Sequence, residues 1–111
     1  PLYSFWKDDI ASWLIFARET LAAAKDIAGD KPVIPLLWPQ YHENNGTNPP
    51  NTYVGDEMWR KQIETVKELS PDGVMLWGGW TFASPTAVHG QTPYREDLPE
   101  IQVMKEMFPD V

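Results

Sequence analysis

Residues 32–38 read Pro32-Val33-Ile34-Pro35-Leu36-Leu37-Trp38, a run with no charged or hydrogen-bonding polar side chain except the indole. Such a run is typical of a strand covered on both faces, as in a parallel sheet between a core and a layer of helices. Pro32 and Pro35 each lack the N–H that a central strand donates to its neighbour. The run therefore predicts a buried strand whose hydrogen bonding is interrupted at the two prolines.

Helical patterns flank this run on both sides. From Asp8 to Ala28 the apolar residues recur at spacings of three and four, the period of an amphipathic helix. Asp8 and Asp9 suit the N-terminus of this helix, and Gly29 suits its end. A second helix is predicted over about residues 56–69, with acidic residues in its first turn, where the helix dipole favours anions.

Two shorter apolar stretches resemble strands. Leu2-Tyr3-Ser4-Phe5 looks like the tail of one, and Val74-Met75-Leu76-Trp77 like another, ended by Gly78-Gly79. The last helix is predicted over about residues 97–108, with Pro99 acceptable in its first turn. The order of strand end, helix, strand, helix, strand and helix predicts an α/β fold with parallel strands. The length of 111 residues allows one domain at most.

The connections are unequal in length. The two helix-to-strand links, residues 29–31 and 70–73, are short, whereas the two strand-to-helix links, residues 39–55 and 78–96, are long. In α/β folds the functional loops follow the carboxyl ends of the strands. The carboxyl ends are therefore the predicted working face.

Composition excludes several classes of function. The net charge is −7 and Lys and Arg form no run, which argues against nucleic acid and anionic membranes as partners. The absence of cysteine excludes disulfides, cysteine zinc sites and thiol nucleophiles. No stretch approaches the roughly 20 apolar residues of a transmembrane helix, so we expect a soluble protein. The start at Pro1, without Met or a signal segment, suggests a piece of something longer. The compartment stays open, with secretion of the full-length protein as one alternative.

Three segments together resemble the last third of hyaluronidase-like glycoside hydrolases. They are Leu2-Tyr3 at a strand end, Pro32-Val33 through Pro39-Gln40-Tyr41, and Asp72-Gly73-Val74-Met75-Leu76-Trp77-Gly78-Gly79-Trp80. The resemblance covers most of the chain, and the third segment is its most specific part. It implies that residues 1–111 form a single partial-barrel domain, the C-terminal segment of a TIM (β/α)₈ barrel carrying strands six to eight.

The resemblance implies hydrolysis of glycosidic bonds by the full-length protein, with this chain supplying an aromatic sugar-binding wall. Two departures matter. The paired acidic motif of the family, Asp-x-Glu after its fourth strand, has no counterpart here, so the isolated chain is expected to be inactive. The Tyr-Thr-Arg stretch of the family is replaced by Leu36-Leu37-Trp38. A glycan other than hyaluronan is therefore the expected substrate.

Trp77 and Trp80 are candidate sugar-binding residues because they flank two glycines at a strand end. Sugar C–H faces stack on indole rings, and glycines let a ligand approach the backbone closely. The alternative is that Trp77 packs inside the barrel and Trp80 covers its rim. Trp6, Trp13 and Trp59 have core spacing and are predicted to be packing residues.

The residues after the middle strand form the second candidate group. Gln40 and Tyr41 suit recognition of sugar hydroxyls, and His42 lies beside them, where barrel enzymes gather their site residues. Glu43, next to His42, is a weak catalytic candidate as general acid or base. The alternative is that His42 and Glu43 belong to a solvated loop. Tyr3, at the end of the first strand, is a further candidate for substrate binding.

Metal ions and cofactors are not expected. The two histidines and the nearby acids do not have the spacing of metal ligands, and no phosphate-binding or nucleophile motif is present. The expected partners are a carbohydrate and either the remainder of a barrel or a second copy of the chain. The alternative function is a non-catalytic glycan-binding or structural α/β module.

Overall fold

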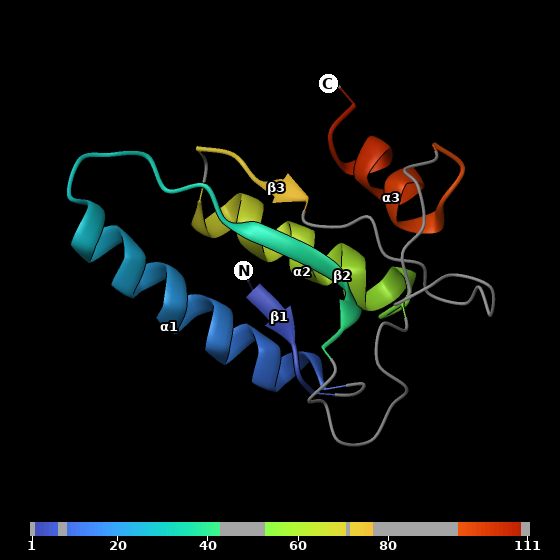
Figure 1. Cartoon of the computed structure of the whole chain (residues 1–111), viewed down its shortest axis with the longest axis horizontal. Helices are drawn as coiled ribbons and strands as arrows, with labels where there is room; N and C mark the ends of the chain where they lie inside the picture. Colours follow the sequence, from blue (N-terminus) through green and yellow to red (C-terminus); the bar gives the residue numbers. More distant parts are fainter. Residues whose placement is uncertain (1, 7–8, 43–52, 71, 77–95, 110–111) are drawn as a thin grey trace.

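Strands and helices alternate along the chain in the computed structural model, which describes residues 2–6, 9–42, 53–70, 72–76 and 96–109. Figure 1 shows their arrangement. In chain order the elements are β1 (Leu2–Ser4), α1 (Ile10–Ala28), β2 (Leu36–Tyr41), α2 (Asp56–Leu69), β3 (Met75–Leu76) and α3 (Pro99–Met107). The predicted α/β class is confirmed.

The three strands form one parallel sheet in the order β1-β2-β3. Leu2 is aligned with Leu37, and Leu36 with Met75. Strands that follow one another in the sequence are therefore neighbours in the sheet, each pair joined through a helix. The predicted parallel pairing of the middle and last strands is confirmed.

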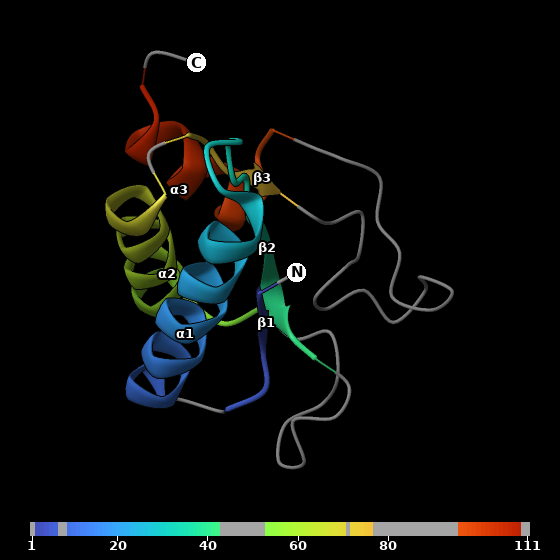
Figure 2. The same ribbon diagram turned by 90° about the vertical axis from the view of Figure 1, so that its left-hand side faces the viewer.

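The three helices lie on one face of the sheet (Figure 2). α2 occupies the centre of the helix layer and contacts α1 on one side and α3 on the other. The opposite face carries no helix from the described ranges (Figures 1 and 2). None of these helices combines the length and the apolar character that crossing a membrane requires.

The boundaries of β2 differ from the prediction. The strand begins at Leu36, directly after Pro35, and continues past the predicted end at Trp38 to Tyr41. Pro32 and Pro35 have no N–H to donate, which disfavours regular pairing in this segment, and the strand begins directly after Pro35. The Pro35 carbonyl still accepts a hydrogen bond from the Met75 N–H at 2.9 Å, which joins the start of β2 to β3.

Polar contacts fix the segment before β2 in place of strand pairing. The Val33 N–H donates to Asp72 Oδ2 at 3.0 Å, and the Val33 carbonyl accepts from Ser70 Oγ at 2.6 Å. Both partners lie in the link between α2 and β3. These contacts explain why an extended segment outside the sheet still has a defined position.

The ends of α1 agree closely with the sequence signals. Asp9 is the N-cap, and its carboxylate accepts from the Ser12 N–H at 3.0 Å and from Ser12 Oγ at 2.7 Å. These hydrogen bonds favour the charged form and lower the pKa of Asp9. At the other end Gly29 adopts a φ of 65°, a conformation that glycine adopts without steric cost, and its N–H bonds to the Lys25 carbonyl.

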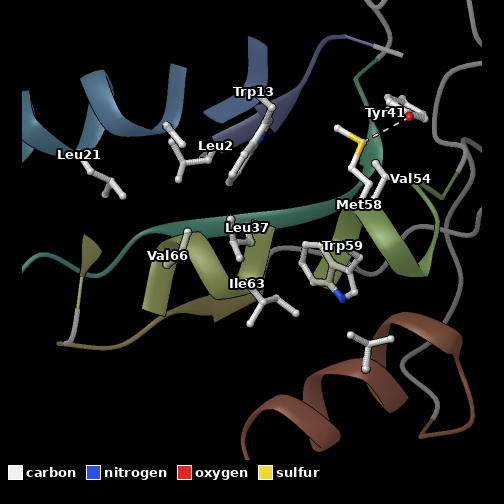
Figure 3. Close-up of a cluster of buried hydrophobic side chains, with 12 residues drawn as sticks. Leu2, Trp13, Leu21, Leu37, Tyr41, Val54, Met58, Trp59, Ile63 and Val66 are labelled. Carbon is white, nitrogen blue, oxygen red and sulfur yellow. Dashed lines mark hydrogen bonds between the residues drawn. The ribbon is translucent and has the colours of Figure 1, made fainter. Parts of the chain in front are cut away.

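The hydrophobic core lies between the sheet and the helix layer (Figure 3). Trp13 from α1, Trp59 from α2 and Leu37 from β2 are all 0% exposed. The predicted packing role of Trp13 and Trp59 is confirmed. Burial of one such side chain stabilises the folded state by roughly 1.5–3 kcal/mol, so these contacts account for much of the cohesion between the layers.

A buried polar contact also joins the two layers. Gln62 on α2 donates from Nε2 to Ser4 Oγ on β1 at 2.8 Å, and both side chains are at most 1% exposed. Gln62 Oε1 has no hydrogen-bond partner within the described ranges. Buried polar groups are costly when left unpaired, so this contact specifies where α2 sits against β1.

Ser4→Ala should lower the free energy of unfolding by about 1–3 kcal/mol, because it leaves the Gln62 amide buried without its acceptor. Gln62→Leu removes the same contact from the other side. The double variant should be less destabilised than the sum of the two single variants, since the second change removes the unpaired group. Urea unfolding of the four proteins measures this coupling, and strictly additive changes would show that the contact has no energetic role.

Candidate functional site

Two aromatic rings project from the helix-free face of the sheet. Tyr3 follows Leu2 on β1, and Trp38 follows Leu37 on β2, with Leu2 and Leu37 aligned and packed in the core. Since successive side chains of a strand point to opposite faces, Tyr3 and Trp38 point away from the helices together. Their ring centroids lie 4.9 Å apart in an edge-to-face arrangement.

His42 extends this pair beyond the end of β2. Its N–H donates to the Ser4 carbonyl at 2.9 Å, which continues the pairing with β1 by one residue. The imidazole centroid lies 4.7 Å from Tyr3, 4.8 Å from Phe5 and 5.9 Å from Trp38. We call Tyr3, Phe5, Trp38 and His42 the aromatic platform. It lies on the helix-free face, toward the carboxyl ends of β1 and β2.

The aromatic contacts continue around the edge of β1 to α1. Phe5 contacts Trp6 and Phe16 with centroids 5.8 and 6.2 Å apart, and Trp6 and Phe16 lie 5.6 Å apart. Trp6 is half-buried and packs against the core, which confirms its predicted packing role, although it lies before α1 and not on a helix. This second group supports the platform from the side of α1.

The rings of the platform pack against one another and are partly accessible. Tyr3, Phe5 and His42 are half-buried, and Trp38 is 8% exposed. Aromatic pairs at these distances stabilise each other by about 0.5–1.5 kcal/mol, so mutual packing holds the rings in place. The exposed parts offer apolar ring surface together with a phenol and an imidazole. Such a surface can contact the C–H groups of a ligand and hydrogen-bond to its polar groups.

The remaining candidates on β2 are both buried. Gln40, two residues after Trp38, lies on the same face of the strand as that ring, because successive side chains alternate between the faces. Gln40 is 1% exposed, and its backbone forms a bridge with Tyr53. Tyr41 points toward the helices, where its hydroxyl lies 3.5 Å from Met58 Sδ (Figure 3). At 3% exposed, Tyr41 belongs to the core beneath the platform. Of the predicted binding residues, the structure brings Tyr3 and His42 together.

Three further candidates, Trp77, Trp80 and Glu43, lie outside the described residues. Phe5 and Trp38 were not predicted as site residues, although the position of Trp38 in the sequence could have indicated it. It immediately follows the apolar pair Leu36-Leu37 in a strand next to the one that carries Tyr3. Aligning the two strands would have put both rings on one face.

A buried carboxyl group lies in the helix layer, at the start of α3. Glu100 is 4% exposed, and burial raises the pKa of its carboxyl because the charged form loses its contact with water. Its Oε2 has no hydrogen-bond partner in the part of the chain that the structure describes. The backbone carbonyl of Glu100 accepts from Trp59 Nε1 at 3.1 Å. Glu100 thus contributes to the contact between α2 and α3.

Tyr53 lies nearby, after the link that follows β2. Its hydroxyl donates to Asp56 Oδ1 at 2.7 Å. Burial, the hydrogen bond to Asp56 and the charge of Asp56 together raise the pKa of Tyr53, so the phenol stays protonated. This pair fixes the start of α2 and has the character of a structural contact.

No group of three potential metal-ligating side chains occurs within residues 2–6, 9–42, 53–70, 72–76 and 96–109. Comparison of the chain with models of protein families, with curated proteins and with solved structures gives no match.

Glu100→Gln should change how stability depends on pH. The folded protein holds the Glu100 proton more tightly than the unfolded chain does, so unfolding releases it. The stabilisation is complete below the ordinary pKa of about 4.5 and is lost as pH rises through the raised folded value. The parent should therefore lose unfolding free energy relative to Glu100→Gln as the pH rises from about 4.5 through the raised pKa of Glu100.

Urea unfolding across this pH range provides the measurement. Glu19, exposed on α1, gives the matched control, because Glu19→Gln removes the same charge without touching the contact between α2 and α3. Parallel pH profiles for the parent and Glu100→Gln would contradict the effect of burial.

Proposed function

We propose that this chain is a segment of a (β/α)₈-type barrel resembling hyaluronidase-like glycoside hydrolases, and that it supplies an aromatic wall for sugar binding. The full-length protein would hydrolyse glycosidic bonds. The observation that carries the proposal is the aromatic platform, Tyr3, Phe5, Trp38 and His42, on the helix-free face toward the carboxyl ends of β1 and β2.

The topology supports the barrel part of the proposal. In a (β/α)₈ barrel, parallel strands follow one another in sequence order and all helices lie on the outer side. Doubly wound sheets instead place helices on both faces. Here the order is β1-β2-β3, and α1, α2 and α3 lie on one face. The platform would then face the inside of the barrel, near its working end.

The chemistry of the platform supports a sugar as ligand. The C–H faces of pyranose rings stack on aromatic rings, and their hydroxyls need nearby hydrogen-bonding groups. Tyr3 and His42 supply a phenol and an imidazole beside the apolar ring surface of Phe5 and Trp38. Such a combination of apolar lining with a few polar groups is the usual character of a small-molecule site.

A non-catalytic glycan-binding module is the second candidate. Glycoside hydrolysis usually requires two carboxyl groups about 5–9.5 Å apart. Residues 2–6 and 36–42, which include β1, β2 and the whole platform, contain no Asp or Glu. The lack of carboxyl groups favours glycan binding without hydrolysis by the isolated chain. Glu43 is the weak catalytic candidate, and a catalytic role for it would favour hydrolysis instead.

Trp38→Ala should weaken glycan binding by roughly 1–3 kcal/mol, because it removes the largest ring of the platform. Titration of short oligosaccharides, followed by calorimetry, measures the change. Tyr53→Ala is the matched control, since Tyr53 is an aromatic residue whose hydroxyl contacts Asp56 at the start of α2, outside the platform. Equal affinities of Trp38→Ala and the parent would exclude the platform as the sugar site.

The same mixtures test hydrolysis. We expect no new reducing ends to appear, because the platform residues include no carboxylic acid that could act as a catalytic pair. Turnover that is lost in Glu43→Gln would identify Glu43 as a catalyst and favour the enzyme over the binding module.

We also propose that the apolar surface at β3 is covered by the remainder of a barrel or by a second copy of the chain. A groove of about 470 Å³ between β3 and α3 is lined mainly by Val74, Leu76, Ile101, Met104 and Phe108. Met75, on β3, is 55% exposed. In the described part of the chain, β3 pairs with β2 alone, and a strand edge with an apolar groove invites association.

Light scattering at micromolar concentration tests this association. The isolated chain should have an apparent mass above its own 12.7 kDa. Met75→Lys, which puts a charge on the exposed strand, should shift the population toward the monomer. A parent chain that stays monomeric at all concentrations would contradict the association of two copies.

A further inference from the structure

We propose that copies of this chain associate head to tail, with β1 and α1 of one copy packed against β3 and α3 of the next. The proposed association of two copies underlies this inference, which adds the two surfaces that meet. Association through any other surface would contradict the head-to-tail contact alone.

The two edges of the sheet can pair with each other. In the described part of the chain β1 and β3 each pair with β2 alone, so no described strand covers the outer edge of either. An uncovered strand edge is a template for pairing with another chain. Because all three strands are parallel, β1 of a second copy can lie beside β3 in the same direction and extend the sheet.

A row of leucines crosses the sheet on its helix side. Leu2 is aligned with Leu37, and Leu37 with Leu76. Next to Leu76 the row ends at the groove of about 470 Å³ between β3 and α3. If β1 of a second copy adopts the same register, its Leu2 lies beside Leu76 and enters this groove. The groove has the position and the apolar character that one more strand requires.

α3 supplies the other wall of the groove. Ile101, Met104 and Phe108 recur at spacings of three and four and line it together. α3 itself is held by α2, since the Glu100 carbonyl accepts a hydrogen bond from Trp59 Nε1 at 3.1 Å. An apolar side of α3 thus faces a space that the described residues leave open.

The matching surface lies on α1, at the opposite end of the helix layer from α3 (Figure 1). Uncharged side chains recur there at spacings of four, three and four, and we call them the α1 stripe: Phe16, Thr20, Ala23 and Ile27. Phe16 contacts Trp6 just after β1, whereas Lys25 on the other flank donates to the Leu69 carbonyl of α2. The α1 stripe therefore lies beside β1, away from α2.

Ile27 is 87% exposed, the highest value among the large apolar side chains of the described ranges. Apolar groups gathered at a free strand edge usually mark a contact with another protein surface. The α1 stripe beside β1 and the groove beside β3 differ from each other, so their contact is heterologous. Each pair of copies keeps one free surface of each kind, and further copies can add until a ring closes.

Two variants that each block one surface test the inference. Met104→Lys puts a charge into the groove, and Ile27→Lys puts a charge on the α1 stripe. In light scattering at micromolar concentration, the parent should grow beyond two chains as its concentration rises. Each variant alone should keep the 12.7 kDa mass of one chain, because every contact would include a blocked surface.

An equimolar mixture of the two variants should form pairs and nothing larger. The Ile27→Lys chain keeps an intact groove and the Met104→Lys chain keeps an intact α1 stripe, so one contact can form in each pair. The matched control is Ile15→Lys, because Ile15 is 59% exposed on α1 but outside the stripe. This control should associate as the parent does.

Three results would overturn the head-to-tail contact. If Ile27→Lys associates as strongly as the parent, the copies meet through another surface, and their association stands. If the mixture of folded variants stays monomeric, the two surfaces do not bind each other. If the parent is monomeric at all concentrations, both the head-to-tail contact and the association of copies are wrong. Circular dichroism of each variant verifies that it is folded.

Discussion

Leu2 of β1 is aligned with Leu37 of β2 in adjacent parallel strands, and this alignment determines which side chains of the two strands meet. Both side chains enter the core, so alternation along each strand sends Tyr3 and Trp38 to the opposite face. A slip of one residue in either strand would put an aromatic ring of the platform into the core and expose a leucine. The core and the pair Tyr3–Trp38 therefore follow from the same alignment. The register then shifts, so that Ser4 is aligned with Tyr41, and His42 comes next to Ser4.

The helix layer maintains this register. α2 packs Trp59 and Ile63 into the core, and its Gln62 reaches β1 through the hydrogen bond to Ser4. The contact from Trp59 to the Glu100 carbonyl extends the layer to α3. Because β1 is only three residues long, its own pairing with β2 is limited, and the contact from α2 adds to its placement. The contacts of α2 thus contribute both to the stability of the core and to the placement of β1, which carries Tyr3.

Much of this architecture is predictable from the sequence. The spacing of apolar residues predicted α2 over residues 56–69, as observed, and Asp9 and Gly29 are the caps of α1. The start of β2 was predicted too early, because the apolar run continues through Pro32 and Pro35 and the missing N–H groups alone do not tell where strand pairing begins. The strand begins directly after Pro35.

The site was harder to predict because it depends on which face each side chain occupies. Tyr41 seemed equivalent to Gln40 and His42 in the sequence, yet its hydroxyl contacts Met58 in the core. Trp38 seemed to be one more apolar residue of a buried strand, yet it lies against Tyr3 and His42. Local sequence gives the order of the residues along β2. The pairing of β2 with β1 determines which of these residues contact the side chains of β1.

Our proposal that the helix-free face binds a ligand can be tested by nuclear Overhauser contacts from a bound oligosaccharide. We expect contacts between sugar C–H protons and the ring protons of Tyr3 and Trp38, with none to Tyr53 near the start of α2. Sugar contacts confined to Tyr53 and the helix layer would contradict this proposal, because the aromatic platform would then be packing without a ligand.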